Sequence, residues 1–144
     1  MPVFVASTLV NAPVEKVFAF HEREDALALL SPPFPPVRVI RKSAGLEPGS
    51  RVELMIGPIR WVALHTILVK NRLFEDRQLS GPFAQWVHRH EFEAEGDATR
   101  LTDRVTFQLP GGTLINALLG WAVRLALTQM FRERHAKTRH YCES

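Results

Sequence analysis

Cysteine is nearly absent from this sequence, and so are the short motifs on which several large enzyme classes depend. Cys142 is the only cysteine among 144 residues, which excludes an intramolecular disulfide and a cysteine-rich zinc site. The sequence contains no nucleophile elbow, no glycine-rich phosphate loop and no dinucleotide fingerprint. The hydrophobic pattern and the positions of histidines and carboxylates are therefore the features that indicate fold and function.

The sequence also has no dense charge of one sign along most of its length. The formal net charge is only +3, and the one basic group, at 132–139, is interpreted as the solvated end of a helix. We therefore expect no nucleic-acid partner. The first residues lack a basic segment followed by a long apolar core, so we expect no signal peptide and a reduced, cytoplasmic protein. The length predicts a single domain over residues 1–144.

The segment from Thr113 to about Arg139 predicts one long helix, because no proline interrupts it and its apolar residues recur at three- and four-residue steps. Its first half is apolar nearly all round, apart from Asn116 and Arg124, which predicts a helix buried on more than one side. The apolar part is too short to span a bilayer, so we expect a buried helix and no stable membrane insertion. Arg124 would reach solvent or pair with a carboxylate.

The rest of the chain predicts mainly strands. A first strand at Val3–Val10 precedes two short helices, one opening at Asn11–Pro13 and one over Glu22–Leu30. About six antiparallel strands follow between Val37 and Leu109. The predicted fold class is therefore α+β: a curved antiparallel sheet of about seven strands gripping the long C-terminal helix, with two short helices after strand 1.

Two hairpin turns predict which side chains share a face of the sheet. A two-residue turn at Gly96-Asp97 places His90 opposite Asp103 and Trp86 opposite Phe107. A two-residue turn at Asn71-Arg72 places Val69 opposite Phe74, Ile67 opposite Asp76 and His65 opposite Gln78. The large apolar members of these sets identify the face that points inward.

The predicted inward face is partly polar, which is unusual because buried polar groups cost free energy unless they are paired. His90 could pair with Asp103, and His88 could reach Asp76. The cluster could be a structural network or the lining of a ligand site, and both interpretations stay open. Its spacing matches no closed zinc pattern, so we expect no metal. For catalysis, His88 or His90 could be a general base oriented by a carboxylate such as Asp103.

The sequence resembles the START-type helix-grip (SRPBCC) superfamily, and within it the bacterial polyketide cyclase/dehydrase-like ligand-binding branch. The resemblance lies in Ala-Pro-Val-Glu-Lys-Val-Phe at 12–18, Leu-Glu-Pro-Gly at 46–49, the run at 74–92, Thr-Arg-Leu-Thr-Asp-Arg-Val at 99–105 and the long final helix. It implies a deep pocket between sheet and helix for a lipid, a polyketide or another apolar ligand. It implies no common catalytic motif, so no catalytic residue is transferred.

The leading hypothesis is a protein that binds a small, largely apolar ligand between the sheet and the C-terminal helix, with no cofactor. The expected ligand-binding residues are Trp61, His65, Phe74, Asp76, Gln78, Trp86, His88, His90, Phe107, Leu118, Ala122 and Ala126. One alternative is a cyclase or dehydratase that uses a His–Asp pair in the same pocket. Another is an interaction module or homodimer through the apolar helix, with Asn116, Leu119 and Val123 at the contact.

Overall fold

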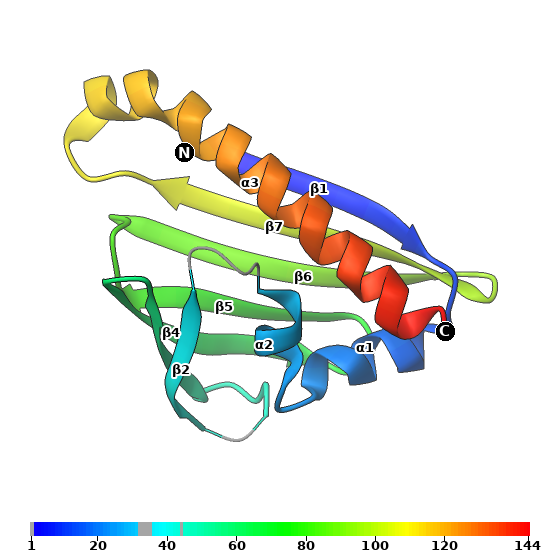
Figure 1. Ribbon diagram of the computed structural model, residues 1–144. Coiled ribbons are helices and arrows are strands. Elements are labelled where there is room, and N and C mark those ends of the chain that lie inside the picture. Colours follow the sequence, from blue (N-terminus) through cyan, green and yellow to red (C-terminus); the bar gives the residue numbers. More distant parts are fainter. Residues whose placement is uncertain (1, 32–35, 44) are drawn as a thin grey trace.

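A computed structural model describes residues 2–31, 36–43 and 45–144 (Figure 1). Over these residues it contains seven strands and three helices, in the following order. They are β1 (Val3–Val10), α1 (Val14–Glu22), α2 (Ala26–Leu30), β2 (Val37–Lys42), β3 (Arg51–Ile56), β4 (Ile59–Val69), β5 (Leu73–Ser80), β6 (Gln85–Glu95), β7 (Ala98–Gln108) and α3 (Gly112–Cys142).

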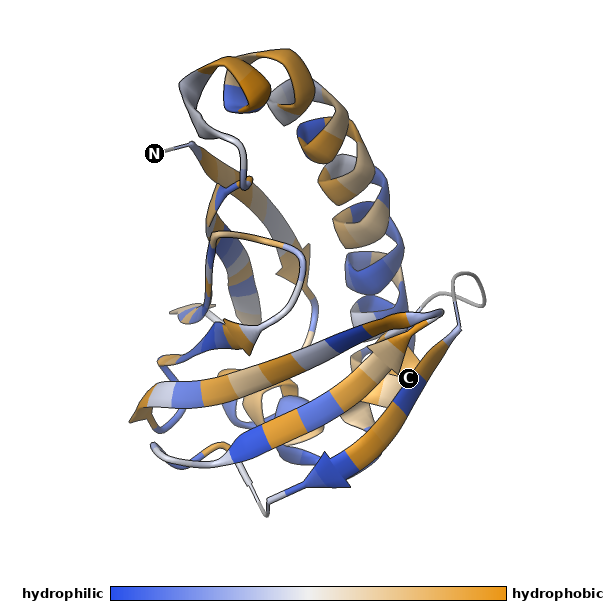
Figure 2. Cartoon of the chain, turned by 90° about the vertical axis from the view of Figure 1, so that its left-hand side faces the viewer, coloured by the Kyte–Doolittle hydropathy of each residue, from blue (hydrophilic) through white to orange (hydrophobic). Residues whose placement is uncertain are grey.

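The seven strands form one antiparallel sheet in the order β1-β7-β6-β5-β4-β3-β2. The sheet is curved, and the three helices lie on its concave side, which we call the inner face (Figures 1 and 2). This confirms the predicted α+β helix-grip fold. The second short helix is shorter than predicted, since it begins at Ala26, whereas Glu22 ends α1.

The predicted pairing of β6 with β7 is confirmed. His90 lies opposite Asp103, Trp86 opposite Phe107 and Phe92 opposite Leu101. Gly96, at the tip of this hairpin, has a positive φ of 63°, a conformation that glycine adopts without steric cost. The register therefore follows from the local turn, as the sequence indicates.

The predicted pairing of β4 with β5 is wrong. Val69 lies opposite Leu73, and His65 lies opposite Asp76 rather than Gln78. The connection is longer than a two-residue turn and has Asn71 in the left-handed conformation, with φ of 61°. A register shift between His65 and Ile67 then changes the pairing again, and a sequence pattern does not reveal such a bulge.

The inner face has three layers along β6 and β7. At one end, Phe92 and Leu101 belong to an apolar group that packs under α1. At the other end, Trp86, Val105 and Phe107 pack with Leu127 and Phe131 of α3. The positions between these two groups are polar. We call the side chains there the polar layer: Asp76, His88, His90, Asp103 and His135.

The N-terminal half of α3 is not buried, contrary to the sequence prediction. Leu114, Leu118, Trp121 and Leu125 are each more than half exposed, Trp121 by 63%. The buried residues of α3 belong to its second half and include Leu127, Phe131 and His135. Figure 2 shows the hydrophobic first turns of α3 extending past the strands, while the more hydrophilic second half lies over the sheet.

Candidate functional site

The polar layer is centred on Asp103, a buried residue of β7. Its two carboxylate oxygens accept hydrogen bonds from three histidines. His88 Nε2 lies 2.8 Å from Asp103 Oδ1, and His90 Nδ1 lies 3.1 Å from the same oxygen. His135 Nε2, from α3, lies 2.6 Å from Oδ2. One carboxylate therefore links two strands of the sheet to the helix that covers them.

His90 connects Asp103 to a second carboxylate. Its Nε2 lies 3.2 Å from Asp76 Oδ2, while its Nδ1 faces Asp103. Imidazole donates from both nitrogens only when it is protonated, so this geometry is that of a cationic His90 between two carboxylates. Burial lowers the pKa of His90, but the hydrogen bonds to Asp103 and Asp76 outweigh burial and raise the pKa above its ordinary value.

The two carboxylates are ionised for the complementary reason. Burial favours the neutral form of Asp103, but hydrogen bonds from His135, His88 and His90 hold its pKa well below the usual range. Burial also acts to raise the pKa of Asp76, and the hydrogen bond from His90 lowers it. His90 thus carries a positive charge, and Asp76 and Asp103 each carry a negative charge.

Three other histidines of the interior are held neutral near pH 7. Burial lowers the pKa of His88, and the positive charge of His90 adds to this effect, since the two rings are stacked with centroids 3.7 Å apart. Burial lowers the pKa of His21 from 6.5 to about 4 and also lowers the pKa of His65. Burial is thus the largest cause of the lowered pKa in each of these three histidines.

Two buried histidines of this region were not among the residues predicted from the sequence. His135 lies in the segment interpreted as a solvated basic end, yet it is buried against Asp103. His21 is buried in α1 and bonds the carbonyl of Val17 through Nδ1 at 2.8 Å. The helical spacing of Leu127, Phe131 and His135 is the signal that could have placed His135 on the inner face.

Aromatic side chains adjoin the polar layer at the end of the sheet where β4 and β6 begin. We call Trp61, Phe83, Trp86 and Phe107 the aromatic group. The Trp61 and Trp86 rings meet edge to face with centroids 5.2 Å apart, and Phe83 lies 4.8 Å from Trp86. Trp61 and Phe83 are only partly buried. Trp61 and Phe83 therefore give the aromatic group a partly accessible edge, whereas Trp86 and Phe107 are buried.

The predicted site residues of the sheet occupy different environments. Gln78 is held by the loop after β5, because its side chain donates to the Phe83 carbonyl at 2.7 Å and accepts from the Phe83 amide at 3.1 Å. Phe74 is buried, and its ring stacks on His90 at 3.9 Å between centroids. His65 is buried with its Nδ1 unpaired among the described residues. His88 and Asp76 lie opposite each other as predicted, but the hydrogen bond to Asp76 comes from His90.

The predicted site residues of the helix do not face the sheet. Leu118 is 56% exposed, and Ala122 and Ala126 are exposed as well. The stripe assigned to the inner side of the helix is therefore its outer side. Arg124 pairs with no carboxylate in the described part of the chain, and instead its Nη1 donates to the carbonyl of Val3 at 3.0 Å.

The residues proposed for a protein contact are mostly engaged within the chain. The Asn116 side chain accepts a hydrogen bond from the Leu109 amide at 2.8 Å and donates one to the Leu109 carbonyl at 2.9 Å. Val123 packs against the apolar group that contains Trp86 and Phe107. Leu119 alone is about half exposed, at 49%. An interaction through Asn116 and Val123 would therefore break existing contacts.

By length and composition alone, α3 could cross a membrane. An 18-residue window within it has a mean hydropathy of 1.4, and 11% of that window is buried. Our expectation of no stable membrane insertion stays a prediction.

Asp76, His88 and His90 have the spacing of potential metal ligands, since one ligand atom from each lies within 4.8 Å of the others. A cation held by these three residues would compete with the hydrogen bonds that His88 and His90 now make to the carboxylates. The ligand types suit a divalent transition metal. The described residues therefore allow a metal, although the polar layer is already internally paired.

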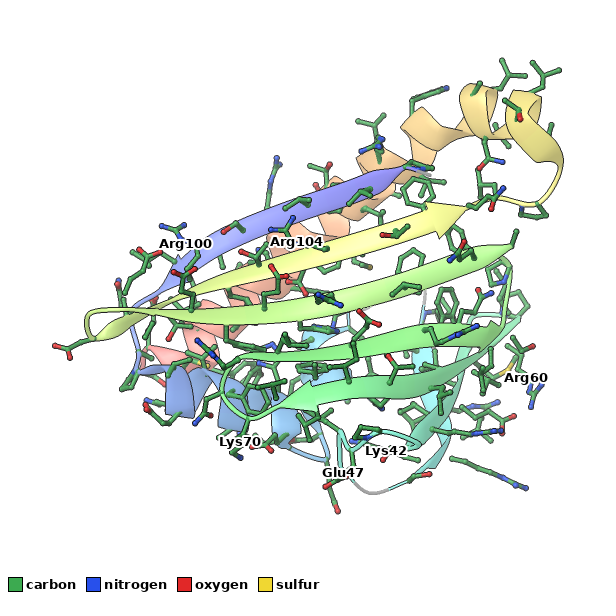
Figure 3. All side chains as sticks on the ribbon, turned by 180° about the vertical axis from the view of Figure 1, so that it is seen from behind. Lys42, Glu47, Arg60, Lys70, Arg100 and Arg104 are labelled. Atoms are coloured by element: carbon green, nitrogen blue, oxygen red, sulfur yellow. The ribbon has the colours of Figure 1, made fainter. Side chains whose placement is uncertain are left out.

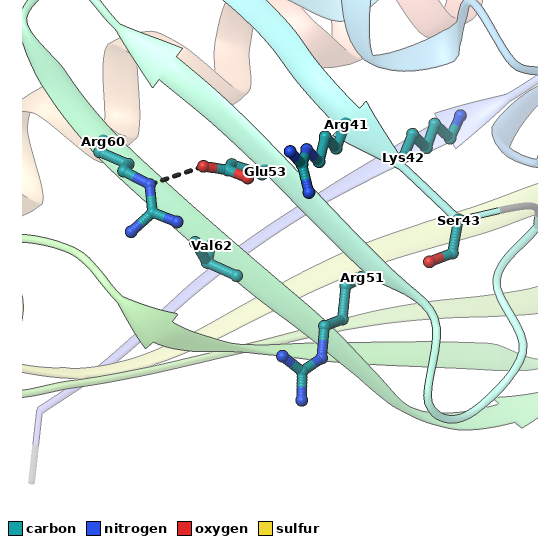
Figure 4. Close-up of a pocket in the computed structure, with 7 residues that line it drawn as sticks. All are labelled: Arg41, Lys42, Ser43, Arg51, Glu53, Arg60 and Val62. Atoms are coloured by element: carbon teal, nitrogen blue, oxygen red, sulfur yellow. Dashed lines mark hydrogen bonds and ion pairs between the residues drawn. The ribbon is translucent and has the colours of Figure 1, made fainter.

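Two open depressions lie on the described part of the chain, and neither is the deep pocket expected between sheet and helix. One, of about 330 Å³, follows β1 alongside α3 and includes Phe4 and Thr128. The other, of about 440 Å³, lies on β2–β4 (Figure 4). The middle of the inner face is filled by the polar layer instead.

A curved sheet gripping a long C-terminal helix defines a class, the helix-grip proteins of the START type. The family described as "Polyketide cyclase / dehydrase and lipid transport" matches residues 10–133. Because this is most of the chain, the protein belongs to that family. Its fold is that of ligand-binding proteins of this class.

Solved structures agree on the fold. A START superfamily protein from Mycobacterium smegmatis is 14% identical, with a TM-score of 0.69, and the match covers 98% of this chain and 97% of that one. Protein TTHA0849 from Thermus thermophilus is 17% identical, with a TM-score of 0.72 and coverage of 96% and 95%.

A nucleoside-diphosphate sugar epimerase from Corynebacterium glutamicum is 26% identical, with a TM-score of 0.75. The match covers 95% of this chain but 28% of the epimerase. No curated protein matches the sequence significantly.

Proposed function

We propose that this protein is a single-domain, cytoplasmic binding protein for a small, largely apolar ligand that lies on the inner face of the sheet. The observation that carries the proposal is the aromatic group, which is partly exposed beside the polar layer. Aromatic walls next to a few polar atoms are the usual lining of small-molecule sites. The family supports the same class of ligand.

The inner face of β4 gives the ligand a path. Trp61, Ala63 and His65 alternate along that face, and the distance from Trp61 to His65 is about 13 Å at 3.3 Å per residue. Val52, Leu54 and Ala63 are buried beside this path, yet neither of the two packed apolar groups, as described, includes them. A ligand on this path would therefore contact apolar side chains that lie outside those two groups.

Two polar groups could recognise a polar atom on the ligand. His65 Nδ1 is buried without a partner among the described residues, which costs free energy that a ligand hydroxyl or carbonyl would recover. Asp76 lies opposite His65 on β5. Its side chain is 17% exposed, whereas the side chain of its partner His90 is 7% exposed. The preferred ligand is thus apolar along most of its length with one polar end.

A titration with the neutral fluorescent probe N-phenyl-1-naphthylamine tests this proposal. Trp61→Ala should raise the Kd about tenfold, because it removes a half-buried ring from the site wall. Trp121→Ala is the matched control, since Trp121 is on the exposed side of α3, and it should leave the Kd unchanged. Equal effects of the two substitutions, or no probe binding by the parent protein, would contradict the proposal.

The second candidate is an enzyme of the cyclase or dehydratase kind. The observation in its favour is His90, which is held between Asp76 and Asp103 and could pass a proton to a substrate through Asp76. Asp76→Asn would then abolish turnover of a polyketide substrate while probe binding persists. A pure binding protein would show no turnover in either form.

A further inference from the structure

The outer face of the sheet separates its charges into two regions. On the β5–β7 side, three arginines pair with carboxylates on neighbouring positions: Arg89 with Glu75 at 2.9 Å, Arg104 with Glu91 at 2.8 Å and Arg100 with Glu95 at 3.0 Å. On the β2–β4 side, the cations outnumber the carboxylates. Figure 3 views this face, with Arg100 and Arg104 along β7 in the upper part of the sheet and Arg60 lower, at the right.

The unbalanced cations line the depression of about 440 Å³ on β2–β4. We call Arg41, Arg51 and Arg60 the basic patch. Glu53 is the only carboxylate among the residues that line the depression, so these three arginines leave a surplus of two positive charges. Arg51 and Glu53 flank the buried Val52 on β3, so their side chains point to the outer face.

The strand pairing brings these residues together. Arg41 lies opposite Glu53, and Glu53 lies opposite Val62, across three adjacent strands. Glu53 bonds Arg60 Nε at 2.6 Å and so fixes that guanidinium (Figure 4). Lys42 lies opposite the buried Val52 and donates to the carbonyl of Glu24 at 3.1 Å, so its charge lies on the inner side and is not part of the basic patch. Arg41 and Arg51 have no ion pair in the described part of the chain, so their donors are available.

We propose that the basic patch binds a soluble anion that carries phosphate. Guanidinium groups bind phosphate oxygens through paired hydrogen bonds, which a bare positive charge does not provide. One phosphate monoester carries a charge of about −1.5 to −2 at neutral pH, so it balances the surplus of two positive charges. The patch is on the opposite face from the proposed apolar site, and the two functions are independent.

Isothermal titration with inorganic pyrophosphate, at fixed ionic strength, tests this inference. The parent protein should bind one pyrophosphate. Arg51→Gln and Arg41→Gln should each weaken binding by about tenfold or more, because each removes charge-assisted hydrogen bonds. Arg104→Gln is the matched control on the same face, and it should leave the affinity unchanged. Thermal melts of all variants check that each one is folded.

Three results would overturn the inference. The first is no binding of pyrophosphate by the parent protein. The second is an equal loss of affinity in Arg51→Gln and Arg104→Gln, which would indicate a diffuse effect of surface charge. The third is binding to vesicles of phosphatidic acid and phosphatidylcholine without binding to pyrophosphate, which would assign the patch to a membrane surface.

Discussion

His90 bonds a carboxylate through each of its ring nitrogens, so its charge is fixed by its neighbours. The charge of Asp103 is likewise fixed by its neighbours, because its carboxylate accepts hydrogen bonds from three histidines that lie on β6 and α3. Buried charges are tolerated only when they are paired and hydrogen-bonded. At the scale of single residues, the polar layer therefore connects α3 to the sheet, whatever it does for a ligand.

Asp103→Asn should destabilise the protein by about 3–5 kcal/mol, the usual cost of removing one partner from a buried charge network. The cationic His90 would lose one of its two carboxylates, and a neutral amide cannot replace the charge. Asp97→Asn, at the exposed tip of the β6–β7 hairpin, is the control and should change stability by less than about 0.5 kcal/mol. Urea unfolding of both variants gives the comparison, and similar midpoints would contradict the assignment.

Part of this layer could be predicted from the sequence. The pairing of His90 with Asp103 follows from a two-residue turn, which is local information. The contact of His135 with Asp103 depends on how α3 lies on the sheet, which no local pattern specifies. The partner of His88 also depends on side-chain rotamers, because Asp76 is its cross-strand neighbour but Asp103 is its hydrogen-bond partner.

The element that departs most from expectation is α3. Its helical period was correctly predicted, but the inner side was assigned to the wrong stripe. Leu114, Leu118, Trp121 and Leu125 have the spacing of a buried stripe, yet they are exposed. In a segment that is apolar nearly all round, periodicity establishes a helix without indicating which side is covered.

Two substitutions in α3 test this orientation directly. Trp121→Gln should change the free energy of unfolding by less than about 0.5 kcal/mol, since the side chain is 63% exposed. Phe131→Ala should cost about 3–5 kcal/mol, because Phe131 is 1% exposed and packs against Phe4 at 5.7 Å between ring centroids. A large loss in Trp121→Gln would mean that this half of α3 is covered after all.

At the scale of the whole molecule, the interior histidines make stability depend on pH. His21, with a pKa lowered from 6.5 to about 4, is protonated in the unfolded chain before it is protonated in the folded protein. Acidification from pH 6.5 to 4 therefore favours unfolding, and His65 and His88 act in the same direction. His90 has a raised pKa, so its contribution is lost as the pH rises through its folded pKa.

We therefore expect a stability maximum near neutral pH, measured by urea unfolding across the pH range. The contribution of His21 between pH 6.5 and 4 should be roughly 3 kcal/mol, at about 1.4 kcal/mol per unit of pKa. His21→Gln should flatten the acid side of the profile by that amount, even if the variant is less stable at every pH. An unchanged slope in this variant would show that His21 is already protonated or solvated in the folded state.

The central claim is that an apolar ligand binds on the inner face rather than on the exposed side of α3. The three tryptophans distinguish these places, because Trp61 and Trp86 belong to the aromatic group and Trp121 is on the outer side of the helix. Trp→Phe substitutions give variants with a single tryptophan each, and these can be titrated with a brominated long-chain alcohol. Bromine quenches the fluorescence of a tryptophan that it touches, so the quenched variant identifies the tryptophan beside the bound alcohol. We predict strong quenching of the Trp61-only protein and none of the Trp121-only protein, whereas quenching of Trp121 without quenching of Trp61 would contradict the account.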